Sequence, residues 1–504
     1  MAASDPFLLT GNCEPVPMAS IPRVSFESFR DFLIDAVKGG ARISAMPVWP
    51  SETGQQLNVL AVMAFPQIAE LGILTSELPP RWPSLTPDCP SFHWFEREIA
   101  EQWHVVPDGH PWLKPIRFAP SCRLQPNQSK SVAIGQTEFF AMSDHEGHEV
   151  AVGPVHAGVI EPGHFRFLCH GETVFHLEIS LGYQHRGIEK AMTGGPTLLS
   201  RHYIETLAGD TTVGHTTAYC NTLEALAAIQ APARAEAIRA IAAELERVAN
   251  HIGDIGALAG DVGFLPTLNY CGRIRGDVLN LTAELCGNRF GRGLLRPGGV
   301  AFDLHAKSID YLSNRIEAIR QDTTSAIELM FDTPSVLARF ERTGTLAIET
   351  ARRIGMVGVA ARACGLEYDI RNEFPYGMYR LAQLPVKTWA SGDCFGRAYV
   401  RWLEIQQSLA FIRQQLHELP GGKTEKELPV IRQGYFCAVL VEGWRGEICH
   451  AVATDQQGRF AFYKVVDPSF HNWFGLALAL RHQQISDFPL CNKSFNLSYC
   501  GHDQ

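Results

Sequence analysis

The pattern of apolar and polar residues divides the chain into a short mixed region, a polar stretch and a long, mainly helical region. Apolar residues recur at helical spacing in residues 26–38 and 94–105, while the uninterrupted apolar run 57–65 has the length and composition of a buried strand. Prolines within residues 79–83 break the chain between these elements. The polar stretch 120–150, which contains glycine and serine, predicts a linker.

Beyond residue 150 the pattern changes first to short strands and then to long helices. Residues 164–168 and 173–179 have strand character, and residues 435–454 return to it. Pro232 stands where a helix would begin, before a stretch that is rich in strong helix formers and carries an apolar stripe. The segments expected to form long helices are residues 233–258, 309–331 and 398–419. This outline predicts an α+β protein whose middle is a helical bundle.

Composition and charge narrow the class of protein. The chain has 504 residues, of which 46% are hydrophobic and 19% are charged, so it can bury a large core in several domains. Its 44 Lys and Arg against 53 Asp and Glu give a formal net charge of -9, which argues against a nucleic-acid-binding protein. The most apolar stretches, residues 225–231 and 474–480, are far shorter than the ~20 residues that cross a bilayer.

The 13 cysteines are the most informative part of the composition. They extend from Cys13 to Cys500, and no two of them have the spacing Cys-x-x-Cys. An odd number without that spacing argues against a secreted disulfide scaffold, a zinc ribbon and a cysteine-ligated iron–sulfur domain.

Two short motifs place ionisable side chains together, and each also has an ordinary structural explanation. A Gly- and Pro-rich segment presents His156 and Glu161 on a tight loop, and its composition is equally that of a solvated β-turn. The second motif carries His185 and Arg186, and its structural alternative is a charged helix face. Neither a phosphate-binding loop nor a Gly-x-Gly-x-x-Gly fingerprint is present, so nothing indicates a nucleotide site for NAD.

Taken together and in order, the motifs resemble two fused peripheral-arm subunits of respiratory complex I. They are similar also to the large subunits of membrane-bound (group 4, formate-hydrogenlyase-type) nickel–iron hydrogenases. The amino-terminal part resembles the small α/β subunit of the arm, through residues 95–99 and 109–111. The markers of the large subunit are residues 153–156, 161–162, 181–190, 218–219, 244–251, 296–303, 362–365, 374–379, 441–447 and 467–473.

This resemblance implies a fold and a division into domains. The fold class is α+β, with a small α/β amino-terminal domain and a large hydrogenase-large-subunit-like domain that has a central helical bundle and peripheral β-strands. The small domain is expected over residues 1–120, a linker over residues 121–150 and the large domain over residues 151–504.

The resemblance also raises the question of which active site is present. Nickel–iron hydrogenases hold their metals with four thiolates from two Cys-x-x-Cys motifs, because soft anionic sulfur suits nickel and iron. Ala208 and Thr211 stand where the first pair belongs, and in the terminal segment Cys491 is followed by Ser494. At most one of the four ligands is left, so we expect no metal site of the usual kind.

The quinone site of complex I is incomplete as well. In that family the quinone headgroup lies between a tyrosine and a histidine, with an aspartate behind the histidine. Asp261 matches the aspartate, whereas Gly209 and Ile160 occupy the other two positions. Neither side chain can donate a proton, so the two-donor arrangement that suits quinone reduction is lost. His156 is left, and it can substitute only if its loop is rearranged.

At the remaining positions that the family implies, this sequence carries the expected types of residue. Glu161 occupies the position of an acidic residue that begins a proton path, with capping of the loop as its structural alternative. His185 and Arg186 are expected to face the iron–sulfur cluster of a separate small subunit, where Arg186 would raise the potential of the cluster. The implied catalytic residues are therefore His156, Glu161 and Asp261.

Three functions follow from the resemblance. The first is an oxidoreductase subunit that passes electrons from a partner's iron–sulfur cluster to quinone or another acceptor, without a nickel–iron site. The second is a non-catalytic structural or coupling subunit of such a complex, and the third is a true nickel–iron hydrogenase with unusual ligands. The expected partners are an iron–sulfur small subunit and antiporter-like membrane subunits, with no nucleic acid. The expected location is the cytoplasmic, peripheral face of the inner membrane, and quinone is the only cofactor expected on the chain itself.

Overall fold

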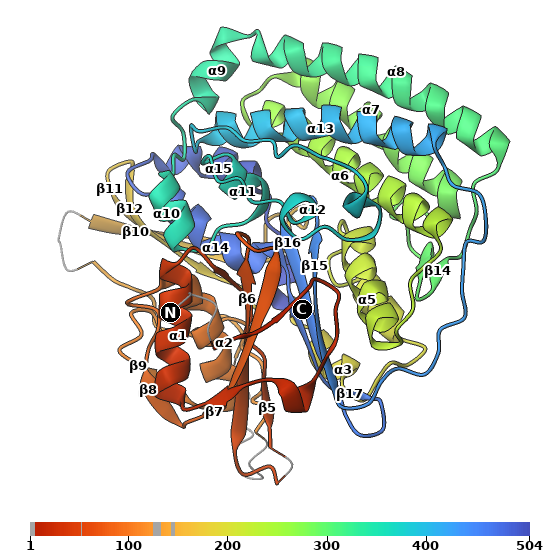
Figure 1. Cartoon of the computed structure of the whole chain (residues 1–504). Coiled ribbons are helices and arrows are strands. Elements are labelled where there is room, and N and C mark those ends of the chain that lie inside the picture. Colours follow the sequence, from red (N-terminus) through yellow and green to blue (C-terminus); the bar gives the residue numbers. More distant parts are fainter. Residues whose placement is uncertain (1–5, 52, 124–132, 143–146) are drawn as a thin grey trace.

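The computed structural model describes residues 6–51, 53–123, 133–142 and 147–504. It is a mixed helical and sheet structure, which confirms the predicted α+β class (Figure 1). Most strands lie in the lower half of the view, those of residues 147–180 lie at its left, and the long helices lie across the top.

The amino-terminal region is built around a six-stranded mixed sheet. Its centre is an antiparallel hairpin of β6 (Leu57–Phe65) and β7 (Glu70–Leu78), and all of β6 is buried, as the apolar run predicts. The outer strands are β1 (Leu8–Thr10), β3 (Arg23–Val24), β4 (Arg42–Ala45) and β5 (Val48–Pro50). The helices of this region are α1 (Phe26–Lys38) and α2 (His93–Trp103), and a parallel strand pair, β8 (Arg81–Pro83) and β9 (Val106–Asp108), flanks α2. The predicted helix 94–105 ends early because His104 takes a left-handed conformation (φ 50°).

The expected linker lies partly outside the described residues. Residues 124–132 and 143–146 of it lie outside the described residues, and residues 133–142 form neither helix nor strand. However, β10 (Gly147–Val152) already pairs with β11 (His164–His170), which pairs in turn with β12 (Thr173–Ser180). Strand β10 thus begins within the stretch that the sequence predicts as a linker, because pairing with β11 gives it a strand conformation.

Long helices of the described large domain pack together as a bundle, which contains all three predicted helices, while α5 (Thr212–Leu226) packs mainly against the strands of residues 435–454. The helices of the bundle are α6 (Ala233–Asp261), α7 (Leu265–Cys286), α8 (Ala306–Phe331) and α13 (Cys394–His417). Both α7 and α13 pack along α6, which is buried over most of its length. Shorter helices connect and flank the bundle: α3 (Ile188–Met192), α4 (Ser200–Glu205), α9 (Pro334–Phe340), α10 (Ile348–Arg353), α11 (Gly358–Arg362) and α12 (Ile370–Glu373).

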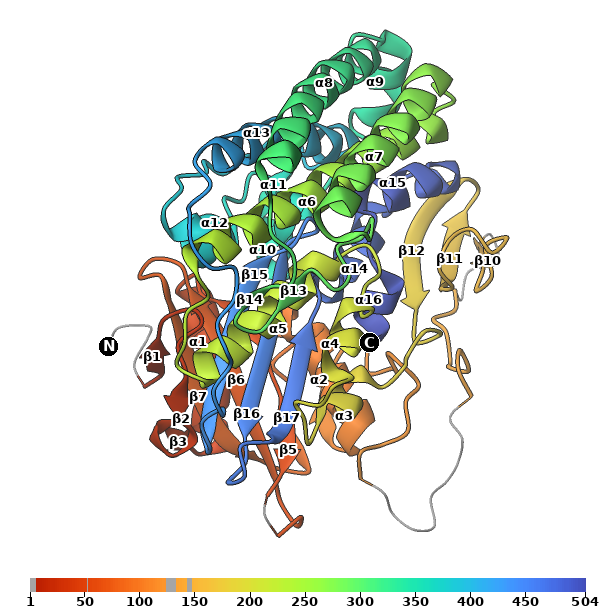
Figure 2. The ribbon, with the colours of Figure 1, turned by 90° about the vertical axis from the view of Figure 1, so that its right-hand side faces the viewer.

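The carboxy-terminal strands form a second buried sheet, and the amino terminus of the chain completes it. Strands β15 (Tyr435–Glu442), β16 (Glu447–Thr454) and β17 (Phe460–Val466) are antiparallel neighbours, and β2 (Val16–Pro17) pairs with the outer edge of β15. Figure 2 shows this sheet between the amino-terminal domain and the helices. The chain ends in α14 (Pro468–Ala479), α15 (Phe488–Phe495) and α16 (Tyr499–Asp503). The two expected domains therefore share a sheet, and the boundary at residues 120–150 stays a prediction.

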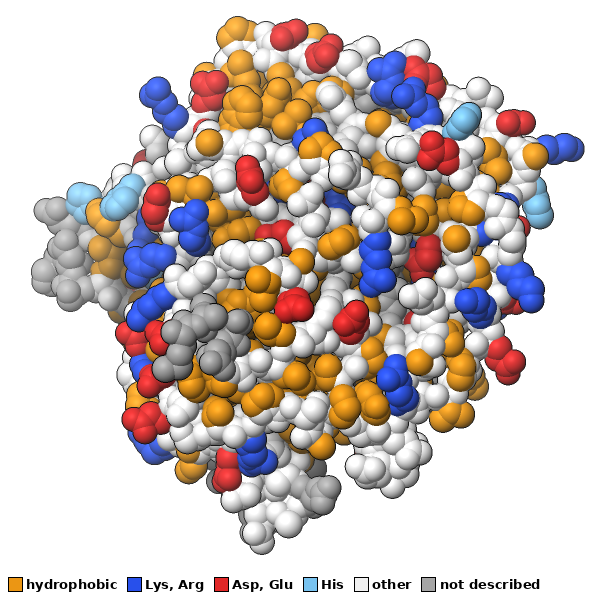
Figure 3. All heavy atoms as spheres, in the orientation of Figure 1, with side chains coloured by type: hydrophobic (Ala, Val, Ile, Leu, Met, Phe, Trp, Pro, Cys, Tyr) orange, Lys and Arg blue, Asp and Glu red, His pale blue; other side chains and the backbone are white. Residues whose placement is uncertain are grey.

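The surface gives no sign of a basic face in the view of Figure 3. Acidic and basic side chains are interspersed there with apolar ones. Among the described residues, no helix is both long and apolar enough to cross a membrane.

Candidate functional site

An ion pair at the amino-terminal end of α5 forms the centre of the candidate site. Asp210 and Thr211 directly precede this helix, and Arg445 lies in the turn between β15 and β16. The Arg445 guanidinium binds both carboxylate oxygens of Asp210, at 2.7 and 2.8 Å, and lies 3.9 Å from the ring of Trp444. The Trp444 indole N–H donates to the Asp210 carbonyl (2.9 Å) and to the Thr211 hydroxyl (3.1 Å). Burial raises the pKa of Asp210, but the Arg445 charge outweighs it and holds the pKa below its usual value.

A chain of buried hydrogen bonds starts one turn into α5. His215 Nε2 donates to Asp467 (3.0 Å), and its Nδ1 lies 3.2 Å from His450 Nε2. The Tyr463 hydroxyl lies 2.8 Å from the other ring nitrogen of His450. Burial and the neighbouring His215 lower the pKa of His450 well below its usual value, so this imidazole is neutral. One set of tautomers satisfies the whole chain, with each group donating toward Asp467.

Glu246 is a further ionisable group in contact with this centre. Its two carboxyl oxygens accept hydrogen bonds from the backbone N–H groups of Val213 (2.7 Å) and Gly214 (3.1 Å) at the start of α5. Burial raises its pKa to about 8, against the opposing effect of these two bonds, and the Asp210 charge raises it further. A carboxyl group with that pKa can hold or release a proton near neutral pH.

The last residues of the chain close the centre from the other side. The Gly501 N–H donates to the Ser498 hydroxyl (2.9 Å), and a side chain at Gly501 would lie only 2.7 Å from the Asp467 carboxyl carbon. Only glycine therefore fits there without displacing Asp467. The Gln504 carbonyl accepts from the backbone N–H groups of Arg186 (2.6 Å) and Gly187 (3.2 Å).

Two protein families match successive parts of the chain. The family described as "Respiratory-chain NADH dehydrogenase, 30 Kd subunit" matches residues 31–134, and the family described as "Respiratory-chain NADH dehydrogenase, 49 Kd subunit" matches residues 261–434. A carbon monoxide-induced hydrogenase of Rhodospirillum rubrum is 30% identical over 69% of this chain and 97% of its own length. The chain belongs to the complex I and membrane-bound hydrogenase large-subunit family.

Other relatives share the fused arrangement of the two parts. Formate hydrogenlyase subunit 5 of Escherichia coli is 28% identical over 83% of this chain and 76% of its own length. The fused C/D polypeptide of an NADH-quinone oxidoreductase of Gluconacetobacter diazotrophicus is 30% identical over 69% of this chain and 62% of its own length. Homologues of this fused complex I and group 4 hydrogenase type are thus subunits of multisubunit oxidoreductases.

The structure brings His185 and Arg186 to the centre. The Arg186 guanidinium donates to the carbonyls of Thr206 (2.8 Å) and Leu207 (2.7 Å), directly before Ala208. His185 Nδ1 lies 2.6 Å from the Asp503 carbonyl. The segment that the family places near the partner's cluster thus contacts both the residues directly before Ala208 and the end of the chain. Its approach to a cluster stays a prediction.

The three implied catalytic residues do not form one cluster. His156 Nε2 hydrogen bonds to the Gly163 carbonyl of its own loop (2.9 Å). Glu161 accepts from the Tyr499 N–H (3.1 Å), which ties the loop to the terminal segment. Asp261 is the last residue of α6, and the contacts among the described residues join it to neither His156 nor Glu161.

The contacts among the described residues join neither Cys491 nor Ser494, the expected terminal ligand positions, to Asp210 or Arg445. Both positions belong to α15, where the Ser494 hydroxyl accepts from Arg397 Nε (2.8 Å) and lies 3.5 Å from the sulfur of Cys394. Residues 498–501 take the place beside Asp467 instead. Cys500 is near, but burial raises its thiol pKa to about 12.

The described residues hold no cluster of three or more His, Cys, Asp or Glu side chains that could bind a metal ion. Sequence reasoning singled out neither Asp210 nor Glu246, because both stand in ordinary polar surroundings along the chain. Arg445 and Asp467 lie within recognised family motifs, but only the fold shows that these motifs meet at α5.

Proposed function

We propose that this chain is the large subunit of a membrane-associated oxidoreductase complex and that it works without a nickel–iron centre. The observation that supports this most is the occupant of the first ligand pair. Ala208 is fully buried, and Thr211 shares its hydroxyl with Trp444 beside the Asp210–Arg445 ion pair. Neither Ala208 nor Thr211 carries a thiol, so this position offers none of the soft thiolate ligands that suit nickel and iron.

In this proposal electrons enter from the iron–sulfur cluster of a small partner subunit on the side of His185 and Arg186. They leave to quinone, or to another acceptor, in the region of His156 and Glu161. Glu161, which contacts the terminal segment, begins the proton path in this proposal, and Glu246 holds a proton at the start of α5. Antiporter-like membrane subunits would anchor the complex at the cytoplasmic face of the inner membrane.

Elemental analysis tests the absence of the nickel–iron centre. The complex is purified with its native partners, and nickel is measured per chain beside the Escherichia coli formate hydrogenlyase, purified in the same way. We expect less than about one tenth of a nickel per chain, because no thiolate pair is available to hold the metal. About one nickel per chain would overturn the proposal.

Quinone is tested separately with the same complex. A quinol analogue is titrated into the wild type and into His156→Ala, with His417→Ala at the exposed end of α13 as a matched control. We expect His156→Ala alone to weaken binding by about tenfold, the effect of losing one hydrogen bond to a buried polar group. No binding to the wild type, or equal binding by all three proteins, would exclude quinone at this site.

The structure also favours one alternative function, a coupling subunit without redox chemistry of its own. Gly209 and Ile160 have no side-chain donor, and the His156 ring already hydrogen bonds its own loop. In that case turnover of the complex is unchanged in a variant that combines His156→Ala, Glu161→Gln and Asp261→Asn. A loss of turnover that leaves assembly intact supports the redox function instead.

A further inference from the structure

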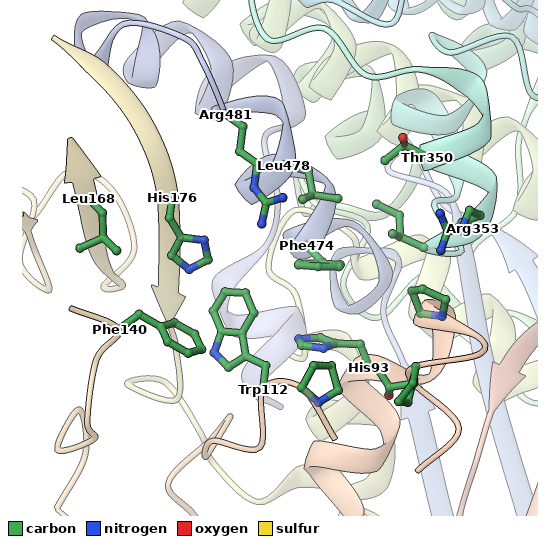
Figure 4. Close-up of a pocket in the computed structure, with 15 residues that line it drawn as sticks. His93, Trp112, Phe140, Leu168, His176, Thr350, Arg353, Phe474, Leu478 and Arg481 are labelled. Carbon is green, nitrogen blue, oxygen red and sulfur yellow. The ribbon is translucent and has the colours of Figure 1, made fainter. Parts of the chain in front are cut away.

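A cavity of about 640 Å³ lies between the amino-terminal domain and the large domain (Figure 4). Its walls come from segments far apart in the sequence: the start of α2, the chain after β9, strands β11 and β12, and helices α10 and α14. None of its lining residues belongs to the centre at Asp210 and Arg445. Its volume lies within the ~300–1,000 Å³ that is typical of sites for small molecules.

One side of the cavity is a continuous aromatic wall. The rings of His93 and Phe474 are stacked, with centroids 4.7 Å apart and planes at 13°. Trp112 lies edge-on to His93 at 5.5 Å and tilted against His176 at 5.1 Å. Phe140 continues the wall at 5.3 Å from Trp112. Flat rings at these spacings favour a flat ligand, because stacked and edge-to-face contacts maximise both buried area and electrostatic fit.

The charge of the cavity is entirely basic. Burial, together with the nearby Arg97 and His110, lowers the pKa of His93 well below its usual value. Burial and the neighbouring Arg481 lower the pKa of His176 in the same way, so both imidazoles are neutral. No Asp or Glu side chain lines the cavity within the described part of the chain.

Two guanidinium groups stand at the rim of this neutral wall. Arg481 follows α14 and extends toward the space between His176 and Phe474, and Arg353 lies across the cavity on α10 (Figure 4). The hydrogen bonds and ion pairs of the described residues include none for either guanidinium. Two unpaired cations over an apolar, aromatic floor attract an anion, and they bind carboxylate or phosphate oxygens in a bidentate way.

Two buried polar atoms of the wall are also unpaired. Trp112 Nε1 and His176 Nε2 have no hydrogen-bond partner among the residues that the structure describes. Both nitrogens are enclosed within the wall, so they do not serve as donors to a ligand in the open cavity.

We propose that this cavity binds a planar aromatic anion. The ring system lies against Trp112, His93 and Phe474, and a carboxylate or phosphate on it reaches Arg481 and Arg353. The stacked wall selects a flat body over an alkyl chain, and the absence of acidic groups among the described lining residues selects a negative group over a neutral one. This site is independent of the proposed electron transfer, because it shares no residue with that centre.

The proposal is tested by calorimetric titration of the full-length protein with three probes. These are naphthalene-2-carboxylate, its neutral amide and the flexible anion dodecanoate. We expect the carboxylate to bind at least about fivefold more tightly than the amide, since each arginine adds a charge-assisted hydrogen bond. We also expect it to bind more tightly than dodecanoate, which cannot stack.

Variants locate the bound probe. Arg481→Gln and Arg353→Gln are each expected to weaken binding of the carboxylate by about three- to tenfold. Phe140→Leu is expected to weaken binding of the carboxylate and to leave the affinity for dodecanoate unchanged. The matched control is Arg352→Gln, which removes the same charge from the same helix at a position outside the cavity lining.

Four results would overturn the proposal. Naphthalene-2-carboxylate does not bind, its amide binds as tightly as the carboxylate, or dodecanoate binds more tightly than the carboxylate. The fourth result is that Arg352→Gln weakens binding of the carboxylate as much as Arg481→Gln and Arg353→Gln do. Because both arginines are exposed, their removal does not endanger folding, and the circular dichroism spectra of the variants confirm this.

Discussion

At the scale of single residues, the centre of the large domain is an arrangement of paired charges at the amino-terminal end of α5. Arg445 is almost completely buried, with 4% of its side chain exposed, and Asp210 is 35% exposed. Arg445 also donates to the Asn496 carbonyl (2.5 Å), so it joins three segments of the chain. Its role is therefore both electrostatic and structural.

Replacing Arg445 by methionine should destabilise the protein by about 2–3 kcal/mol. This expected loss is smaller than the ~3–5 kcal/mol that breaking a fully buried ion pair costs, because water can partly hydrate Asp210. Chemical denaturation measures the effect. Arg459→Met, which breaks an exposed pair with Asp455, serves as the control and should change stability by less than about 0.5 kcal/mol. Adding Asp210→Asn to Arg445→Met should recover part of the lost free energy of unfolding. If the effects of the two substitutions simply add, the two side chains do not form a direct pair.

Glu246 predicts a distinct pH dependence. Its pKa rises from 4.5 to about 8 on folding, so between these values the folded protein holds a proton that the unfolded chain has released. The contribution of Glu246 to the free energy of unfolding therefore falls as the pH rises from 4.5 to about 8. Glu246→Gln removes this titration and keeps an oxygen for the two N–H groups. Its melting temperature should vary less between about pH 5 and pH 8, and should exceed that of the wild type at about pH 8.

Thermal melts at several pH values check this prediction. The control is Glu349→Gln, on the exposed first turn of α10, whose melting profile should follow the wild type. If the melting temperature of Glu246→Gln falls with pH as steeply as that of the wild type, Glu246 titrates normally and the prediction is wrong.

At the scale of elements, the two domains are joined by charged groups as well as by packing. Glu98 of α2 pairs with Arg117 and with Lys464 of β17 (2.6 Å), and all three side chains are buried. Burial raises the pKa of Glu98, but the two cations outweigh it and lower the pKa to about 2. This carboxylate therefore binds an amino-terminal helix to the carboxy-terminal sheet.

Glu98→Gln leaves two buried cations without their partner and should cost about 3 kcal/mol or more at about pH 7. Because the folded pKa is depressed, the stability that Glu98 adds is complete above pH 4.5 and is lost as pH falls toward 2. The difference between variant and wild type in denaturation should thus shrink below about pH 4. The control Glu77→Gln affects only an exposed pair with Arg23, and an equal loss there would contradict this account.

The elements themselves were largely predictable, because their signals are local. The strand at 57–65 and the three long helices follow directly from apolar spacing and helix-forming composition, and the helix ends differ by a few residues. The start of β10 was missed because its residues are all half-buried or exposed, which leaves little apolar signal. Its strand conformation depends on pairing with β11.

At the scale of the whole molecule, the beginning and the end of the chain lie in one core. Asn12 is buried, and its amide donates to the carbonyls of Phe374 and Leu440, at 2.8 and 3.0 Å, and accepts from the Leu440 N–H at 2.9 Å. This side chain therefore fixes the amino-terminal segment to β15, more than 400 residues away.

Asn12→Ala should destabilise the whole protein by about 2–3 kcal/mol, since it leaves buried backbone groups unsatisfied. Unfolding should remain a single transition by both fluorescence and circular dichroism, because the shared sheet couples the two parts. Ser20→Ala, at an exposed position of the same segment, is the control. A separate early transition for the amino-terminal domain would show that the two parts fold independently.

The sequence by itself determined the family, the α+β class, the long helices and the absence of any Cys-x-x-Cys spacing, because each is written in local spacing or motif. Only the tertiary structure decided which segment closes the centre. Residues 498–501 lie beside Asp467, while Cys491 and Ser494 pack against α13. The raised pKa of Glu246 and the aromatic cavity likewise depend on which distant segments pack together and exclude water, and no local pattern encodes that.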